Sequence, residues 1–195
     1  DDMSRTFVPF FHKKTDNYTV YYDYEAKHFF KSEIGRQHPL LPALSGAVGI
    51  IIYALFKDMV LDIGFRHPIS VVLFSLFISC ILATGAIGGL LYSTKKHLND
   101  RKVIVTLSKE ELVHYLHEGE RWLKSKLSLL SLLFFFIFIN SLFLFFIPKS
   151  GLFFFTNTGL SAALIILVWG IRPIKRKKIY SQFKKKIKNE KLELI

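Results

Sequence analysis

A cysteine and a histidine beside one apolar stretch have the side-chain types of a cysteine-peptidase dyad. They are Cys80 and His67. A dyad needs hydrogen-bond reach between the two side chains, whereas thirteen positions on one helix separate them by about 20 Å. His97 is another candidate partner, but Cys80 lies among apolar residues, where a thiolate is disfavoured. The sequence therefore favours an inert, buried cysteine, and no catalytic residue is predicted.

A pair of histidines, His114 and His117, is spaced as i and i+3 on an expected helix, with Glu118 beside it. Imidazole and carboxylate groups bind zinc, but a pair alone supplies too few ligands for a structural site. The chain has one cysteine, which excludes an internal disulfide and a Cys-X-X-Cys zinc pattern. A solvated helix face is the favoured interpretation, so neither a metal nor a cofactor is predicted.

Small residues recur at four-residue spacing in two apolar stretches. Gly85 and Gly89 form one such pair, Gly88 doubles it, and Ser45 with Gly49 repeats the spacing earlier in the chain. Small residues let the backbones of membrane helices approach closely. Two uses stay open, namely packing inside the chain and binding of a partner helix.

Amide and hydroxyl groups are the only strongly polar side chains inside the later apolar stretches, and hydrogen bonds between helices are the favoured use for them. They join the small residues in one predicted set of helix-packing or partner-binding residues. The set consists of Ser45, Gly49, Gly85, Gly88, Gly89, Asn140 and Asn157.

Four apolar stretches of membrane-spanning length contain these residues, at 40–56, 68–92, 127–147 and 152–171. A transmembrane helix needs about 20 apolar residues, and a soluble helix would keep a polar face that these stretches lack. A tight turn at 148–151 makes the last two an antiparallel hairpin. We therefore predict an all-α integral membrane protein with four transmembrane helices in two antiparallel hairpins.

The segments between the spans are expected to be small. Strand-like patterns occur at Tyr18–Tyr22 and Lys102–Leu107, and these two strands would pair with each other. Ser108 and Glu111 form a capping box that begins a helix leading toward the third span. The first 38 residues are too few for a domain core of their own. The predicted segments are 1–38, 39–92, 93–126, 127–171 and 172–195.

The distribution of positive charge predicts the orientation. Lysine and arginine are concentrated between the second and third spans and after the fourth, so these parts and both termini are expected in the cytoplasm. The basic tail is expected to contact anionic lipid headgroups rather than nucleic acid. The predicted headgroup contacts are Lys175, Arg176, Lys177, Lys178, Lys184, Lys185 and Lys186.

The layout of the chain resembles the tandem five-transmembrane proteins of staphylococci and their relatives. The resemblance rests on the runs His38–Gly46 and Tyr53–Lys57, the loop around Asp62, the following span, and a similar start at Phe7–Phe11. The chain departs from the family in having four strong spans. The resemblance implies, for some members, immunity against a membrane-depolarising toxin exported by a type VII secretion system. It implies no catalytic residues.

The spans contain no ionisable side chain between their ends, which argues against a proton-coupled transporter. We therefore predict a non-enzymatic multi-pass membrane protein that binds another membrane protein within the bilayer, with toxin immunity as the leading role. Two alternatives stay open: a small accessory subunit of a transport or secretion complex, and a membrane peptidase. The sequence does not identify the partner.

Overall fold

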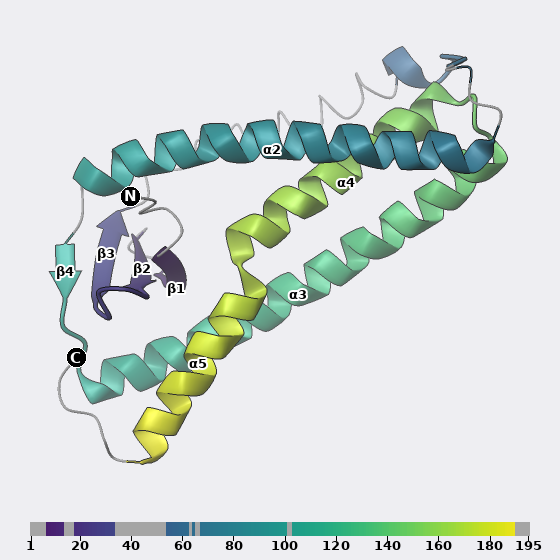
Figure 1. Cartoon of the computed structure of the whole chain (residues 1–195). Coiled ribbons are helices and arrows are strands. Elements are labelled where there is room, and N and C mark those ends of the chain that lie inside the picture. Colours follow the sequence, from purple (N-terminus) through teal and green to yellow (C-terminus); the bar gives the residue numbers. More distant parts are fainter. Residues whose placement is uncertain are drawn as a thin grey trace. The chain divides into compact units, whose positions relative to one another are not determined.

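The described part of the chain is mostly helical and carries one small antiparallel sheet (Figure 1). The computed structural model describes residues 7–13, 18–33, 54–62, 64, 67–100 and 103–189, with the side chains of residues 13, 33 and 93–100 excepted. The strands are β1 (Phe7–Lys13), β2 (Tyr18–Asp23), β3 (Phe29–Glu33) and β4 (Val103–Val105). The helices are α2 (Pro68–Asp100), α3 (Lys109–Phe146), α4 (Gly151–Ile171) and α5 (Pro173–Lys188).

Three stretches of helix are long and apolar enough to cross a membrane. They are Pro68–Tyr92, Lys109–Phe146, and Gly151–Lys188, which α4 and α5 make together. Long apolar helices thus lie where the second, third and fourth spans were expected. The first expected span, 40–56, falls outside the described residues except for its helical end at 54–56, and Ser45 and Gly49 fall outside with it.

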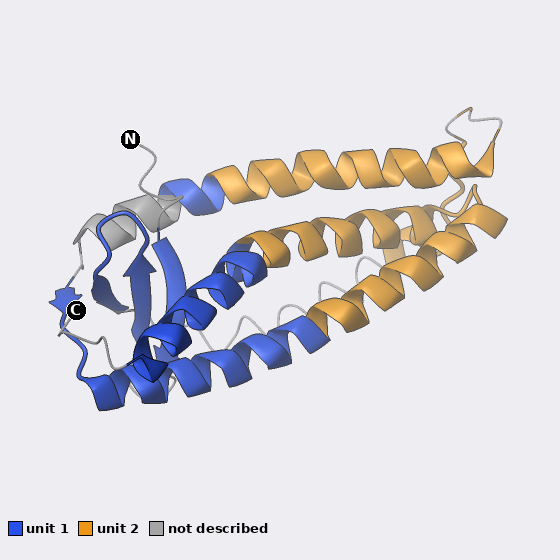
Figure 2. Ribbon diagram, turned by 60° about the horizontal axis from the view of Figure 1, so that its bottom comes forward, with its two compact units in different colours: residues 1–36, 89–128, 170–195 blue, residues 37–88, 129–169 orange. Residues whose placement is uncertain are grey.

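The chain divides into two compact units (Figure 2). Unit 1 consists of residues 1–36, 89–128 and 170–195, and unit 2 consists of residues 37–88 and 129–169. Unit 1 contains the sheet, the first part of α3 and α5, whereas unit 2 contains most of α2, the rest of α3 and most of α4. The charged side chains are therefore concentrated in unit 1 and the apolar helices in unit 2.

In unit 2, α2 and α3 each bury a narrow stripe, whereas most of α4 is buried or partly buried. On α2 the buried side chains recur at every fourth position, from Val71 through Ser75 and Ser79 to Ala83. On α3 they recur at Leu130, Ile137 and Leu144, one heptad apart. Many phenylalanine and leucine side chains on the remaining faces are exposed, from 36% for Leu167 to 75% for Phe146, as expected for helices surrounded by lipid.

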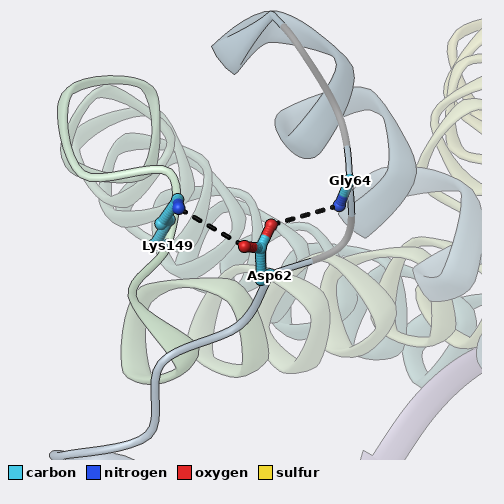
Figure 3. A network of polar contacts seen from close by, with 3 residues as sticks. All are labelled: Asp62, Gly64 and Lys149. Carbon is cyan, nitrogen blue, oxygen red and sulfur yellow. Dashed lines mark hydrogen bonds and ion pairs between the residues drawn. The ribbon is translucent and has the colours of Figure 1, made fainter.

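The loop before α2 and the turn between α3 and α4 are joined by backbone and side-chain contacts (Figure 3). The amide of Leu61 donates to the carbonyl of Lys149, and the amide of Gly151 donates to the carbonyl of Met59, each at 2.8 Å. Lys149 Nζ also lies 3.4 Å from a carboxylate oxygen of Asp62. The two loops of unit 2 therefore hold its helices together at one end.

Unit 1 contains a four-stranded antiparallel sheet in the order β1-β2-β3-β4. Strand β2 and strand β4 were expected from their patterns, but they do not pair with each other, because β3 lies between them. No strand was predicted for the segment from Phe7 to Phe11, and this segment forms most of β1. Every strand alternates its side chains between two faces, so each face of the sheet can be buried.

Aromatic rings form the core of unit 1. Phe10 and Phe29 contact each other edge to face at 5.1 Å between ring centroids, and Phe183 of α5 contacts both. Tyr180 of α5 donates its hydroxyl proton to the carbonyl of Phe10 at 2.7 Å. The N-terminal segment was expected to be too short for a core of its own. Its rings are instead buried against α5, a helix distant in sequence.

The capping box at the start of α3 forms as predicted. The backbone N–H of Glu111 donates to Ser108 Oγ at 3.2 Å, and the N–H of Ser108 donates to the Glu111 carboxylate at 2.9 Å. The pair satisfies two backbone donors that a helix start leaves without partners. From this cap α3 continues without interruption to Phe146, so the helix that begins at the capping box and the third predicted span are one element.

Gly151 provides a direct test of the contact between the two loops. A Cβ atom at this position would lie 2.8 Å from the carbonyl oxygen of Met59 and 2.9 Å from its Cβ. Gly151→Ala should therefore push the loops apart and lower the free energy of unfolding by about 1–3 kcal/mol, which a lower melting temperature in detergent would report.

The matched control is Gly159→Ala on the same helix, where a Cβ would meet nothing within 4 Å. This control should not lower the melting temperature, since alanine favours the helix over glycine. Equal melting temperatures for the two variants would contradict the close approach at Gly151.

Candidate intramembrane recognition face

A buried hydrogen-bond cluster joins helices α2, α3 and α4 of unit 2. Asn157 of α4 is fully buried, and its side-chain amide donates to Ser75 Oγ of α2 at 2.8 Å. The amide oxygen of Asn157 accepts a hydrogen bond from Ser141 Oγ of α3 at 2.9 Å. One asparagine thus bridges α2 and α3, and its donor and acceptor groups are both paired inside the unit.

Two further contacts extend this cluster along the helices. Ser79 Oγ of α2 lies 2.9 Å from the carbonyl oxygen of Thr158, and Asn140 of α3 donates to the carbonyl of Phe153 at 2.8 Å. Polar groups in hydrocarbon are costly unless they are paired. Asn140 and Asn157, predicted for helix packing or partner binding, therefore contribute to packing within unit 2.

The glycines of α2 differ from these residues because nothing described lies against them. Gly85, Gly88 and Gly89 are exposed, and a Cβ atom added to each would meet no atom within 4 Å. They lie off the buried stripe of α2, which continues from Ala83 through the half-buried Ile87. Of the two uses left open for this motif, packing within the chain is not seen among the described residues, and most of the first expected span lies outside them.

The candidate catalytic and metal-ligating groups do not form a site. His67 lies just before α2, and Cys80 is exposed on that helix thirteen positions later, about 20 Å along its axis. His117 Nδ1 is 3.9 Å from a carboxylate oxygen of Glu118, and His114 packs beside Phe11. Among the described residues there is no cluster of three potential metal ligands.

The basic tail forms α5, and its cations occupy different environments. The six lysines predicted to contact headgroups are exposed, and Lys184 also forms a 2.7 Å ion pair with Glu120 of α3. Arg176 is 3% exposed, with its guanidinium 4.3 Å from the ring centroid of Trp122. Arg176 therefore packs inside unit 1 and does not lie at the surface with the lysines.

Arg176 also affects the pKa of a tyrosine in the sheet. Burial raises the pKa of Tyr21, and the positive charge of Arg176 lowers it in part. Two nitrogens of the guanidinium, Nε and Nη1, have no hydrogen-bond partner. The stacking on Trp122 is therefore the main favourable contact that the structure gives this cation, and such contacts strengthen when water is excluded.

Sequence reasoning missed the serine partners in unit 2. Ser75 and Ser141 are ordinary residues for apolar helices, and each bonds to Asn157 from a different element. A faint signal exists, because Ser75 and Ser79 lie four positions apart and therefore share one helix face. That spacing does not identify which distant residue they meet.

Comparison of the chain with models of protein families, with curated proteins and with solved structures gives no match. Its function is therefore argued from its own residues and geometry.

Replacement of the central asparagine tests the cluster. Asn157→Leu keeps a similar volume but removes both hydrogen bonds between helices, leaving Ser141 Oγ without its partner. We expect the free energy of unfolding in detergent to fall by about 1 kcal/mol, in the range measured for such bonds in membrane proteins.

Thr156→Val is the control, because the Thr156 hydroxyl bonds only to the carbonyl of Leu152 in its own helix. This variant should unfold with nearly the free energy of the unmodified chain. If Asn157→Leu proves as stable as Thr156→Val, the cluster does not hold the three helices together.

Proposed function

We propose that this chain is a non-enzymatic multi-pass membrane protein that binds another membrane protein within the bilayer. The observation that carries the proposal is the accessible glycine face of α2, defined as Gly85, Gly88 and Gly89. In the orientation that we propose, both termini and the basic unit 1 face the cytoplasm, in keeping with the positive-inside rule.

The glycine face suits a helix of a partner better than any other ligand. Because the glycines have no side chain, the backbone of α2 can approach a second helix closely there. Van der Waals contact between the two helices then supplies the affinity. Asn140, Asn157 and the serines that they or Thr158 meet are already paired inside unit 2. They therefore leave close packing, rather than polar recognition, as the means of binding.

Toxin immunity is the role that we propose for this binding. A membrane-inserted toxin presents apolar helices in the same bilayer, and a protein that packs against one of them can block its assembly into a conducting form. The resemblance to the tandem five-transmembrane proteins supports this choice, as does the lack of ionisable side chains within the predicted spans.

The accessory-subunit alternative rests on the same glycine face, with a stable membrane complex as the partner. The two roles differ in a measurable way, because a subunit co-purifies with larger proteins in fixed stoichiometry whereas an immunity protein does not. No described contact activates Cys80, so no observation favours the peptidase alternative.

The test is a protection assay in bacterial cells that express a candidate membrane-depolarising toxin together with this chain. A voltage-sensitive dye reports membrane potential with and without the chain. The unmodified chain should prevent depolarisation, whereas Gly85→Ile combined with Gly89→Ile should abolish protection by blocking the approach of a partner helix. Because a Cβ at either glycine meets nothing within 4 Å, this variant should keep its expression level and melting temperature.

Ala86→Ile is the control, since it places one isoleucine at an exposed position of the same helix without replacing a glycine. It should protect cells as well as the unmodified chain does. Equal depolarisation with and without the unmodified chain, at confirmed membrane expression, would contradict the immunity role. Full protection by the double isoleucine variant would instead contradict the role of the glycine face.

A further inference from the structure

A pocket of about 380 Å³ opens on unit 1, between the turn that joins β2 to β3 and the last part of α5. Pockets of this volume are large enough to bind small molecules. Three aromatic side chains and three lysines account for nearly all of its lining. They are Tyr22, Tyr24, Phe183, Lys27, Lys185 and Lys186.

The aromatic side chains form a continuous wall. Tyr22 lies edge to face with Phe183 at 5.2 Å between ring centroids, and Tyr24 lies edge to face with Tyr22 at 6.5 Å. Phe183 is buried in the core of unit 1, whereas Tyr24 is 45% exposed. The wall is therefore anchored at one end by the core and reaches solvent at the other.

The turn between β2 and β3 places the first lysine at the pocket. Asp23 Oδ1 accepts hydrogen bonds from the amides of Glu25 and Ala26, at 3.0 and 3.1 Å, which closes the turn. Lys27 follows with a φ of 55°, a left-handed conformation that few residues other than glycine adopt. The carboxylate of Asp23 is thus engaged with the backbone of the turn.

The three lysines of the pocket form no ion pair with any described carboxylate. Lys184, their neighbour on α5, differs because it pairs with Glu120. The pocket lining itself contains no acidic residue, and Lys186 Nζ lies 5.8 Å from the ring centroid of Phe183. Three like charges around one aromatic wall favour an anionic ligand.

Tyrosine hydroxyls add hydrogen-bond donors to these charges. Burial raises the pKa of Tyr22, and Tyr24 and Asp23 raise it further, so the Tyr22 hydroxyl keeps its proton at neutral pH. A phosphate group offers several acceptor oxygens and up to two negative charges, which matches several lysines better than a single carboxylate does.

We propose that this pocket binds a phosphate-bearing ligand, with the phosphate held by Lys27, Lys185 and Lys186 and the remainder of the ligand lying against Tyr22 and Tyr24. The phosphate can belong to an anionic lipid headgroup or to a soluble molecule, since the recognition chemistry is the same. The inference does not depend on the glycine face, which belongs to a different part of the chain.

The experiment uses the full chain purified in dodecyl maltoside, which carries no phosphate. Calorimetry measures binding of inorganic pyrophosphate in one arm, and native mass spectrometry measures retained short-chain phosphatidylglycerol in the other. Lys185→Gln combined with Lys186→Gln should weaken binding about 10- to 30-fold, from roughly three- to fivefold per lost charge. Binding of pyrophosphate alone identifies a soluble ligand, and retention of phosphatidylglycerol alone identifies a lipid.

The matched control is Lys177→Gln combined with Lys178→Gln, which removes the same charge from exposed positions of the same helix. The control should weaken binding by less than about threefold, because its lysines do not line the pocket. Equal weakening by the two variants would show attraction to basic surface in general and overturn the proposal. Failure of the unmodified chain to bind in either arm would overturn it as well.

Discussion

The pairing of polar groups inside hydrocarbon is the constraint on which unit 2 depends. A serine or asparagine without a partner there costs several kcal/mol, which favours contact with another helix or with its own backbone. Among the described side chains of unit 2, Ser161 Oγ is the exception, because it is buried without a hydrogen-bond partner. Asn157 meets this requirement by bonding to Ser75 and Ser141 from two other helices. The register of α2, α3 and α4 follows, because a shift of one helix along another would break these bonds.

The same constraint decides which faces of the helices remain available. Once α2 turns Ser75 and Ser79 inward, its exposed glycines necessarily lie on another part of its surface. On α3 the buried residues recur one heptad apart and form a narrow stripe, which leaves most phenylalanines of that helix exposed. Association with a further helix is then possible without disturbing the contacts that hold unit 2 together.

Unit 1 depends on different contacts. Its small sheet is stabilised by the burial of aromatic rings and by a close approach of backbones at Gly119. A Cβ atom at Gly119 would lie 2.6 Å from Tyr180 Oη and 2.7 Å from the carbonyl oxygen of Phe10. Glycine at this position therefore lets α3, α5 and β1 meet. Three segments that are distant in sequence share one core, which explains how a short N-terminal segment is ordered without a core of its own.

Local signals in the sequence predicted the parts of the fold that depend on neighbouring residues. The capping box at Ser108 and the apolar stretches of three described helices are of this kind, since a few adjacent residues determine them. The four-stranded sheet was only partly predicted, because β1 and β3 gain their stability from rings on α5.

The burial of Arg176 was missed for a related reason. A run of four cations at 175–178 is typical of a solvated surface, and the stack on Trp122 joins two elements far apart in sequence. A helical signal was nevertheless present, because Arg176 shares the i, i+3, i+4, i+7 spacing of the buried Ile179, Tyr180 and Phe183. The pattern identifies the buried face of α5 only when the arginine is counted with the apolar residues.

Site-specific photocrosslinking in living cells tests the central claim, that the glycine face of α2 binds another membrane protein. A photoreactive phenylalanine replaces the exposed Tyr92 in one strain and the exposed Leu73, on the same helix, in another. Tyr92 lies four positions after Gly88 and three after Gly89, beside the glycine face, so its replacement leaves the glycines in place. We expect a discrete protein adduct from position 92 and lipid adducts alone from position 73. No protein adduct at position 92, or the same adduct from both positions, would contradict the claim.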